Sequence, residues 1–445
     1  MGAKAAEADS DASSRERNER GFPAERAVGP FGVASLVTEL PRFRGLFNLY
    51  AYQALAGSAV PGVGCPPDPV IGYGASCASE STAKRIAIAE AMERYSAGDF
   101  LGEERQFARA AELSGQVLDL DRVPRCSERE YADPRCTFAP PDPDSRIRWV
   151  RGYDLMTGDS VWIPAVMACY TMRDLLPGER FTFQISTGYA VHTDPVEAMI
   201  RGIFEVIERD AISLIWLQKL APPRLNLNAL GPAGVHGLVD WADKHFIKTF
   251  LFDATTDLGI PTVYCLQLAE HDSLAHQVLG CNTARTFESA ATKAVQEATL
   301  LRFAFHASEP VPTSFADFKD AKSGGRYMGV PERLGAFDFL FNEGGGRVPH
   351  AAAQVLPGQP DQTLSLLCST LRSKNMPVYV VDRTASELAE LGLTAVSVII
   401  PDLQPMSLYP VGNFLGHRRL RDAPASMGIA PLPEESMNSW PQPFM

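Results

Sequence analysis

The sequence has 445 residues and a formal net charge of −12, and hydrophobic residues make up 45% of it. A chain of this length predicts about two or three compact units around a sizeable core. The acidic balance excludes proteins that coat nucleic acids or anionic membranes, because both functions need a broad basic surface.

The polar N-terminus lacks the apolar segment of a secretory signal, and no run of about 18 apolar residues could span a bilayer. We therefore expect a cytoplasmic protein without a membrane segment. The composition predicts a flexible tail over 1–30, a main body over 31–430 and a proline-containing tail over 431–445. Within the body, the motif-bearing core spans 70–302 and a C-terminal strand region spans 364–412.

The first half of the body contains one clear helix and several strands. Small and charged residues along one helical stripe predict a helix over 83–97. Residues 116–146 are rich in proline and predict an irregular excursion. Two β-rich runs, 148–155 and 160–166, flank a Thr-Gly-Asp turn and predict a hairpin, and a further strand is expected over 181–185.

A second helix is expected to begin at Asp194-Pro195. Aspartate is a favoured N-cap, proline suits the first helical position, and Glu197 completes a capping box. The later elements expected are strand 261–268, helix 288–302, helix 364–372, strand 377–381, helix 385–391 and strand 394–400. Because strands followed by a helix recur, the sequence predicts an α+β fold with pseudo-repeated β-hairpin/helix units.

Two of these helices carry the same Glu-x-x-Glu-Arg pattern. The residues are Glu90, Glu93 and Arg94 in the first helix, and Glu205, Glu208 and Arg209 in the second. Residues three apart share a helix face, and buried ionised carboxylates are costly unless they are paired or bound to metal. Two interpretations stay open here: a structural pair of acidic helices, and a Mg²⁺ site whose arginines contact phosphate.

Other common catalytic arrangements lack support in this sequence. The eight histidines and eight cysteines are scattered, and neither pattern contains the histidine that a di-iron site would add. No Gly-x-x-x-x-Gly-Lys-Ser/Thr stretch occurs, which excludes a P-loop. A nucleotide site in this chain must therefore be built in another way.

Several stretches occur in an order that resembles the YcaO family. They are Gly72-Tyr-Gly-Ala75, Glu90-Ala-Met-Glu-Arg-Tyr95, Ser186-Thr-Gly-Tyr-Ala190, Glu197-Ala198, Glu205-Val-Ile-Glu-Arg-Asp-Ala211 and Glu297-Ala298 with Arg302. A weaker match continues through Pro401-Asp-Leu403. The resemblance implies a YcaO-like fold around a central nucleotide cavity, and an ATP-dependent enzyme that activates peptide backbone amides.

The resemblance also implies roles for individual residues. Glu90, Glu93, Glu205 and Glu208 would hold Mg²⁺. Arg94, Arg209 and Arg302 would face the phosphates of ATP, and the first two would also act in catalysis. Ser186, Thr193 and Glu297 would contact the nucleotide. Tyr73 stands where lysine is common in the family, and Thr193 stands where asparagine is common.

The best-known members are cyclodehydratases of ribosomally made peptides. There a Cys, Ser or Thr side chain attacks the preceding amide and ATP phosphorylates the resulting oxyanion, which yields a thiazoline or oxazoline. Such enzymes typically end in Pro-x-Pro-x-Pro. This chain ends in Pro441-Gln-Pro443-Phe-Met445, which would place the Met445 carboxylate in the active site.

The implied partners are a ribosomal precursor peptide and a separate E1-like leader-binding protein, because no fused amino-terminal E1-like region is expected. A flavin-dependent azoline dehydrogenase and a homodimer are further options, whereas nucleic acid and membranes are not expected. Two other functions stay open. The same fold can use an external nucleophile to form a thioamide or amidine, and a degenerate member could be a non-catalytic scaffold. Retention of all four glutamates argues against the scaffold.

Overall fold

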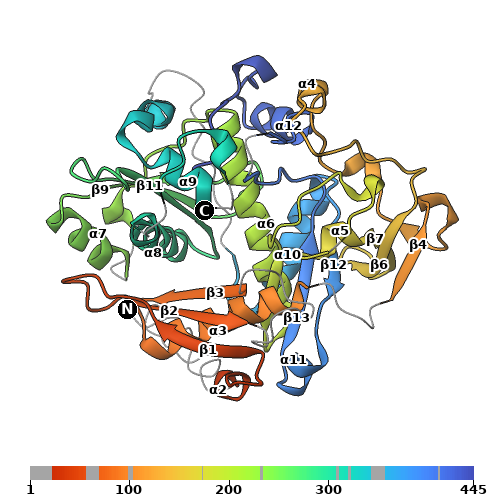
Figure 1. Ribbon diagram of the computed structural model, residues 1–445, viewed down its shortest axis with the longest axis horizontal. Coiled ribbons are helices and arrows are strands. Elements are labelled where there is room, and N and C mark those ends of the chain that lie inside the picture. The colour runs from red at the N-terminus through yellow and green to blue at the C-terminus, as the bar shows by residue number, and fades with distance from the viewer. Residues whose placement is uncertain are drawn as a thin grey trace.

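Three sheets and three long helices make up the architecture (Figure 1). The computed structural model describes residues 23–56, 70–98, 104–172, 174–230, 234–306, 310–318, 322–341, 356–408 and 411–444. Residues 1–22 of the expected N-terminal tail, and Met445, lie outside these ranges. Each sheet has one of the long helices packed on it, and these helices carry the acidic residues.

The N-terminal sheet is antiparallel, with the order β1-β2-β3. The elements here are α2 (Ala24–Ala27), β1 (Ala34–Glu39), β2 (Tyr50–Ala56), β3 (Val70–Ser76) and α3 (Glu80–Ser96). Helix α3 begins at the N-cap Ser79, whose hydroxyl accepts a hydrogen bond from Thr82 N at 3.1 Å. The predicted helix over 83–97 is confirmed. The sequence does not predict β1, because most of its side chains stay partly exposed and leave no clean alternation.

A second antiparallel sheet repeats this arrangement, with the order β9-β10-β11. Its elements are α7 (Val235–Lys244), β9 (Lys248–Asp253), β10 (Thr262–Leu268), β11 (Gln277–Thr283) and α8 (Phe287–Phe305). Helix α8 packs on β10 and β11, just as α3 packs on β2 and β3. The expected pseudo-repeat is therefore present, and the strand over 261–268 and the helix over 288–302 are confirmed.

The largest sheet has seven strands, in the order β5-β7-β6-β12-β13-β8 with β4 paired to β6. They are β4 (Arg105–Ala108), β5 (Gln116–Val117), β6 (Ile147–Asp154), β7 (Ser160–Pro164), β8 (Tyr189–His192), β12 (Tyr379–Asp382) and β13 (Thr394–Ile399). The hairpin expected over 148–155 and 160–166 is confirmed as β6 and β7. The remaining helices are α4 (Glu128–Ala132), α5 (Ala165–Ala168), α9 (Lys322–Met328), α10 (Pro360–Ser373), α11 (Ser386–Glu390) and α12 (Arg419–Ser426).

One predicted strand is wrong. Residues 181–185 join no sheet. The ring of Phe183 lies 4.5 Å from that of Phe138 and 5.3 Å from that of Phe414, in edge-on contacts. Phe183 therefore packs in an aromatic cluster. A β-rich composition alone does not distinguish a segment of this kind from a strand.

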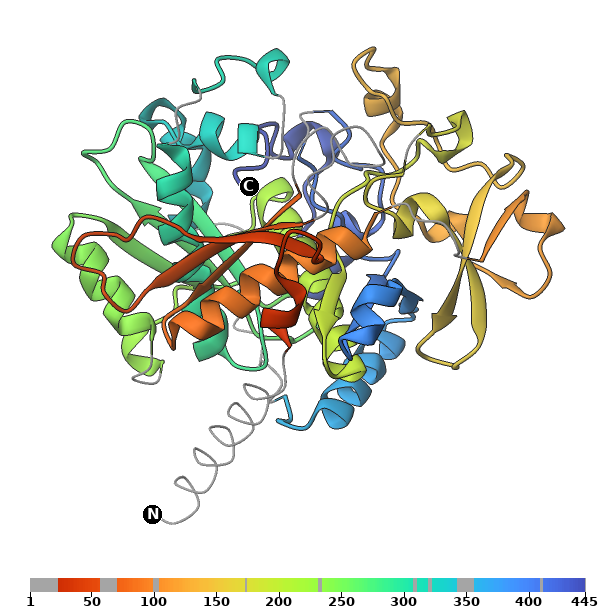
Figure 2. The same cartoon turned by 60° about the horizontal axis from the view of Figure 1, so that its bottom comes forward.

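Helix α6 (Pro195–Leu217) runs through the middle of the molecule in both views (Figures 1 and 2). Its predicted start is confirmed, since the Asp194 carboxylate accepts hydrogen bonds from Val196 N at 2.8 Å and Glu197 N at 3.4 Å. The expected capping box is wrong. Glu197 pairs with Arg285 at 2.6 Å, and Asp194 N donates to His192 Nδ1 at 2.9 Å instead.

Glycines let α3 approach β3 at backbone distance. A Cβ placed on Gly74 would lie 2.2 Å from Ala87 N and 2.3 Å from Ala83 O, both backbone atoms that cannot rotate away. We expect Gly74→Ala to lower the free energy of unfolding by about 1–3 kcal/mol, measured by urea denaturation. Gly358→Ala is the control, because a Cβ there meets nothing within 4 Å. Equal stability of the two variants would contradict the close approach.

The C-terminal residues pack against the body, and 437, 438 and 441–444 are buried. Leu432 N donates to the Gln218 side chain at 2.7 Å, and Trp216 Nε1 donates to Trp440 O at 3.0 Å. Phe444 is fully buried, with its ring 5.4 Å from that of Tyr264 on β10. Residues 431–444, which the sequence predicts to be a tail, therefore form an integral layer against the end of α6.

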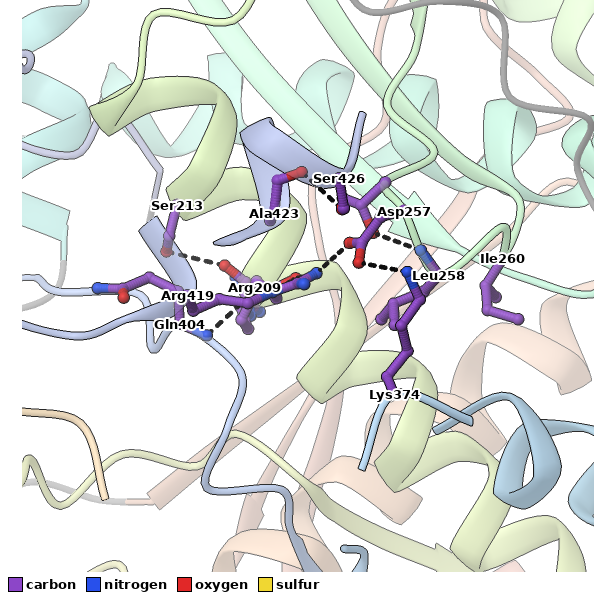
Figure 3. Close-up of polar contacts among 12 residues, drawn as sticks. Arg209, Ser213, Asp257, Leu258, Ile260, Lys374, Gln404, Arg419, Ala423 and Ser426 are labelled. Atoms are coloured by element: carbon purple, nitrogen blue, oxygen red, sulfur yellow. Dashed lines mark hydrogen bonds and ion pairs between the residues drawn. The ribbon is translucent and has the colours of Figure 1, made fainter. Parts of the chain in front are cut away.

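A buried ion network joins α6 to α12. The Arg419 guanidinium donates to both oxygens of Asp210, at 2.7 Å for the shortest contact, and lies 2.7 Å from Asp257 (Figure 3). Lys374 completes the network at 3.0 Å from Asp257, and Gln404 N donates to Asp210 at 2.8 Å. Because Asp210 follows the second Glu-x-x-Glu-Arg pattern directly, this network fixes the helix segment that carries it.

Two further findings on the described residues concern membrane-spanning helices and disulfides. None of their helices combines the length and apolar character that spanning a lipid bilayer requires. None of the seven cysteines among them forms a disulfide.

Candidate active site

The three long helices each place a glutamate beneath the strand that precedes it. In every case a backbone amide of that strand or its entry loop donates to one carboxylate oxygen. The bonds are Tyr73 N to Glu90 at 2.9 Å, Gly188 N to Glu205 at 2.9 Å and Cys281 N to Glu297 at 2.8 Å. The same local geometry thus occurs three times, on α3, α6 and α8.

The second glutamate of each pattern reaches across to the next unit. Glu93 on α3 accepts a hydrogen bond from Val191 N on β8 at 3.3 Å. Glu208 on α6 accepts from Thr283 N on β11 at 3.0 Å and from the Asn282 side chain at 3.1 Å. These bonds join the three units in sequence and bring the first four glutamates and Glu297 into one electrostatic group.

Arg94 and Arg209 balance part of this negative charge. Arg94 lies 2.9 Å from Glu90, and Arg209 lies 3.7 Å from Glu205 and 4.0 Å from Glu208. Two of the glutamates remain partly accessible, since the side chain of Glu90 is 27% exposed and that of Glu205 is 26% exposed. A ligand can therefore reach the carboxylates from solvent.

Four carboxyls of this group, those of Glu93, Glu205, Glu208 and Glu297, have raised pKa values. Burial, followed by the nearby carboxyl of Glu90, raises the pKa of Glu93 to about 8. Burial also raises the pKa of Glu208 to about 8, and it raises those of Glu205 and Glu297. Raised carboxyl pKa values at one site mark a place where added positive charge is favourable.

The donor set fits a hard cation such as Mg²⁺. It consists of carboxylate oxygens that are each anchored by a backbone hydrogen bond, with Glu90 and Glu205 partly exposed and Glu208 buried. Within the described ranges, no three acidic, histidine or cysteine side chains converge closely enough to hold an ion as they stand. The arginines supply the positive charge instead, so metal binding requires these side chains to shift.

Of the other predicted residues, Ser186 and Thr193 lie on either side of β8, near the backbone amides of Gly188 and Val191 that donate to Glu205 and Glu93. Ser186 O accepts a hydrogen bond from Tyr189 N at 3.4 Å, in the turn whose Gly188 amide holds Glu205. Thr193 comes two residues after Val191, whose amide donates to Glu93 at 3.3 Å, and one residue before the N-cap of α6. Met445 lies outside the described residues.

Arg302 is not brought to the glutamates. It is 4% exposed, donates to the Gln267 side chain at 2.9 Å and to Gln267 O at 2.8 Å, and also donates to Ala275 O. Five residues after Glu297, a side chain points about 140° away around the helix. Arg302 therefore fixes the loop between β10 and β11 and faces Asp272.

Lys293 is a residue that sequence reasoning missed. It lies one turn before Glu297 on α8, on the same helix face, and remains exposed. Desolvation of the ammonium group, followed by the positive charge of Arg201, lowers the pKa of Lys293 to about 8. The negative charges of Glu208 and Glu197 raise it. The signal was available in the sequence, because Lys293 and Glu297 have i,i+4 spacing on an alanine-rich helix.

Two curated relatives match part of the chain. An uncharacterized protein in the tfuA 3′ region of Rhizobium leguminosarum bv. trifolii is 30% identical over 197 residues, covering 42% of this chain and 43% of the relative. An uncharacterized protein of Methanothermobacter thermautotrophicus is 28% identical over 196 residues, covering 43% and 46% respectively. Each match thus spans less than half of the relative's length.

Solved structures share the fold at low identity. A heterocyclase in complex with substrate and cofactor has a TM-score of 0.78 at 22% identity, covering 96% of this chain and 57% of that one. YcaO from Methanopyrus kandleri, bound with AMPPCP and Mg²⁺, has a TM-score of 0.60 at 20% identity, covering 87% and 90%. The E. coli microcin synthetase McbBCD complex with pro-MccB17 has a TM-score of 0.61 at 14% identity, covering 93% and 98%.

A family model described as YcaO cyclodehydratase, ATP- and Mg²⁺-binding, matches residues 72–404, which include all three glutamate-bearing helices. With most of the sequence matched in this way, the chain belongs to the YcaO family.

Proposed function

We propose that this protein is a Mg²⁺- and ATP-dependent cyclodehydratase that converts Cys, Ser or Thr residues of a ribosomal precursor peptide to thiazolines or oxazolines. The observation that carries the proposal is the group of five carboxylates, two arginines and Lys293 contributed by α3, α6 and α8. Polyphosphate with Mg²⁺ suits such a group, because the metal takes carboxylates while the cations take phosphate oxygens. The range 31–430 would be the catalytic unit.

Glu90, Glu93, Glu205 and Glu208 would hold the metal, and Glu297 joins them through its place in the same group. Bound Mg²⁺ supplies charge neutralisation at the phosphates during phosphoryl transfer. Arg94 and Arg209 would orient the transferring phosphate, because a guanidinium binds its oxygens in a fixed geometry. Lys293, rather than Arg302, is the further cation that we propose to contact the nucleotide, because the charge of Glu208 acts on it.

The reaction balances as a dehydration driven by ATP. The side-chain sulfur or oxygen of the peptide residue loses its proton and attacks the preceding carbonyl carbon, and the new oxyanion takes the γ-phosphoryl group of ATP. Loss of the amide N–H proton and departure of phosphate, which carries the former carbonyl oxygen, leave a C=N bond. The peptide loses one water in total, and ATP becomes ADP and phosphate.

The similar structures support this assignment and its partners. One is a heterocyclase with substrate and cofactor, and another is a synthetase complex that holds pro-MccB17. A precursor peptide and at least one partner protein therefore belong to the proposal, with an E1-like leader-binding protein as the specific candidate.

Mass spectrometry tests the reaction directly. The protein would be combined with a precursor peptide encoded beside it, any neighbouring E1-like protein and Mg·ATP. We expect loss of about 18 Da for each Cys, Ser or Thr converted, because the peptide loses two hydrogens together with the oxygen that leaves in phosphate. Exchange of oxygen for sulfur would identify thioamidation instead. The absence of ATP turnover in every combination would favour a binding scaffold.

The carboxylate group also predicts a pH dependence. Glu93 and Glu208 titrate at about 8 in the folded protein against 4.5 ordinarily, so folded protein binds more protons than unfolded protein between these values. Without divalent metal, the free energy of unfolding should therefore fall as pH rises across this window. Urea denaturation near its two ends measures the effect, and added Mg²⁺ should stabilise most at the alkaline end.

Glu93→Gln provides the control for this experiment, since it removes one of the two titrating groups and should flatten the dependence. A slope that is identical in this variant and in the original protein would place the titration elsewhere in the molecule.

A further inference from the structure

A cavity with aromatic walls lies where the loop before β2 meets the ends of α7 and α8, elements that lie together at the left of Figure 1. Its volume is about 260 Å³, and its lining includes Phe43, Trp241 and Phe303. The Phe43 ring lies 5.4 Å from that of Trp241 and 6.2 Å from that of Phe303, in edge-on contacts. The charged residues of the wall, Arg302 and Asp272, already have hydrogen-bond partners. The cavity therefore favours an apolar occupant.

Phe246 stands beside this cavity with its side chain in solvent. It is 81% exposed, and its ring lies 6.5 Å from that of His271, which lines the cavity. Phe246 ends α7 in a Schellman motif, because Phe246 N donates to Asp243 O at 3.1 Å and Ile247 N donates to Ala242 O at 2.9 Å. Its φ of +59° is the left-handed conformation that glycine usually supplies at this position. The exposed ring and the backbone conformation are both unfavourable in an isolated molecule.

The apolar area around the cavity matches what a dimer of standard size needs. Phe303 is 42% exposed, and Phe47, in the loop that carries Phe43, is 80% exposed. At about 200 Å² for a whole phenylalanine, these two residues and Phe246 expose about 400 Å² of mostly apolar surface. A standard interface buries about 800 Å² on each partner, and a little over half of that area is apolar.

The charged groups around this face balance one another. Lys248 pairs with Glu270 at 2.7 Å, and Asp272 lies 4.0 Å from the buried Arg302. The other charged side chains on the adjoining described residues are Arg42, which pairs with Glu39, and Arg44, Asp240, Asp243 and Lys244. With neutral histidines these sum to zero, whereas the whole chain carries −12. Because like charge opposes contact between two copies, a face without net charge is the one that a second copy can approach.

A projecting ring and a cavity on the same face are what a two-fold symmetric dimer requires. In such an interface every contact occurs twice, so each copy can both insert a ring and receive one. The cavity is large enough for the benzyl group of phenylalanine, and its aromatic walls suit edge-on contact with that group.

We propose that this face joins two copies of the chain about a two-fold axis, with Phe246 of each copy seated in the Phe43–Trp241–Phe303 cavity of the other. The end of α8, the helix that carries Glu297 and Lys293, would then lie at the contact between the copies.

Sedimentation velocity of the full chain over a series of concentrations tests this arrangement, and we expect a monomer–dimer equilibrium. Phe246→Gly should raise the dimer dissociation constant at least about 100-fold, because each dimer loses two buried rings. Glycine suits the left-handed conformation, so thermal melting of this variant as a monomer should be unimpaired. Phe31→Ala is the control, because it removes an exposed ring between α2 and β1, and it should dimerise like the original protein.

Cross-linking between copies identifies the contact itself. Protein with p-benzoyl-phenylalanine in place of Phe246, irradiated together with isotope-labelled original protein, should attach to labelled peptides that contain residues 269–272 or 302–306. Attachment elsewhere in the labelled copy, an undiminished dimer in Phe246→Gly, or a monomer at every concentration would overturn the proposal. If the original protein stayed monomeric and a neighbouring E1-like protein bound it but not Phe246→Gly, the face would serve that partner, and the proposed second copy would be wrong.

Discussion

Glu208→Gln should abolish ATP turnover while leaving the protein folded. The loss should be about 100-fold or more, because the substitution removes a charged oxygen from the proposed metal and phosphate site. Glutamine keeps an oxygen that can accept the Thr283 N hydrogen bond, now 3.0 Å long. Because the carboxylate has a pKa of about 8 through burial, a neutral amide at this position should not destabilise the metal-free protein at alkaline pH.

Two measurements separate this prediction from simple unfolding. Phosphate release from ATP, in the presence of precursor and partner, reports the activity, and thermal melting without metal reports the fold. Glu80→Gln, at the exposed start of α3, is the control and should retain turnover. Full turnover by Glu208→Gln would refute the assignment of the site, whereas a large drop in melting temperature would show that the glutamate acts structurally.

Arg419→Met should lower the free energy of unfolding by about 3–5 kcal/mol, the largest stability effect that we expect of a single substitution in this chain. Arg419 is 2% exposed, and its two partners, Asp210 and Asp257, are 0% and 5% exposed. Without the guanidinium, Asp210 would be left buried with its charge uncompensated. Methionine fills similar space, so the loss reports charge rather than volume.

Urea denaturation measures this difference. Arg421→Ala on the same helix is the control, since that side chain is exposed and its loss should change stability by no more than about 0.5 kcal/mol. Combining Arg419→Met with Asp210→Asn should cost less than the sum of the two single changes, because the pair acts as a unit. Additive effects would show that the network does not couple α6 to α12.

The local sequence pattern was sufficient to predict the two helices that carry the Glu-x-x-Glu-Arg pattern, α3 and α6. The start of α6 is determined by Asp194 and Pro195, whose capping chemistry acts within a single turn. The pairing of glutamates along one face also follows from helix periodicity, so Glu90 with Glu93 and Glu205 with Glu208 were predictable as pairs. The recurrence of strands followed by helices was visible for the same reason.

Elements stabilised by distant contacts were less predictable. Strand β1 has few buried side chains and is recognisable only by its partner β2, while residues 181–185 have strand-like composition but pack as part of an aromatic cluster. Residues 431–444 are polar and contain several prolines, yet they pack against the body, where Gln218 and Trp216 hold their backbone and 441–444 are buried. Burial of this kind depends on contacts with residues that are distant in the sequence, and the composition of the segment does not reveal those contacts.

The sequence by itself was enough to indicate the YcaO family, which the family match confirms, and to predict candidate site residues, because motif spacing and helix capping are local properties. Only the tertiary structure decided which charges share a site. It brought Glu297 and Lys293 into electrostatic contact with the motif glutamates, because Glu208 of α6 bonds to β11, the strand before α8, and it turned Arg302 away toward Asp272. The position of a residue in a helix determines on which face it lies. The packing of the three units determines which residues that face contacts.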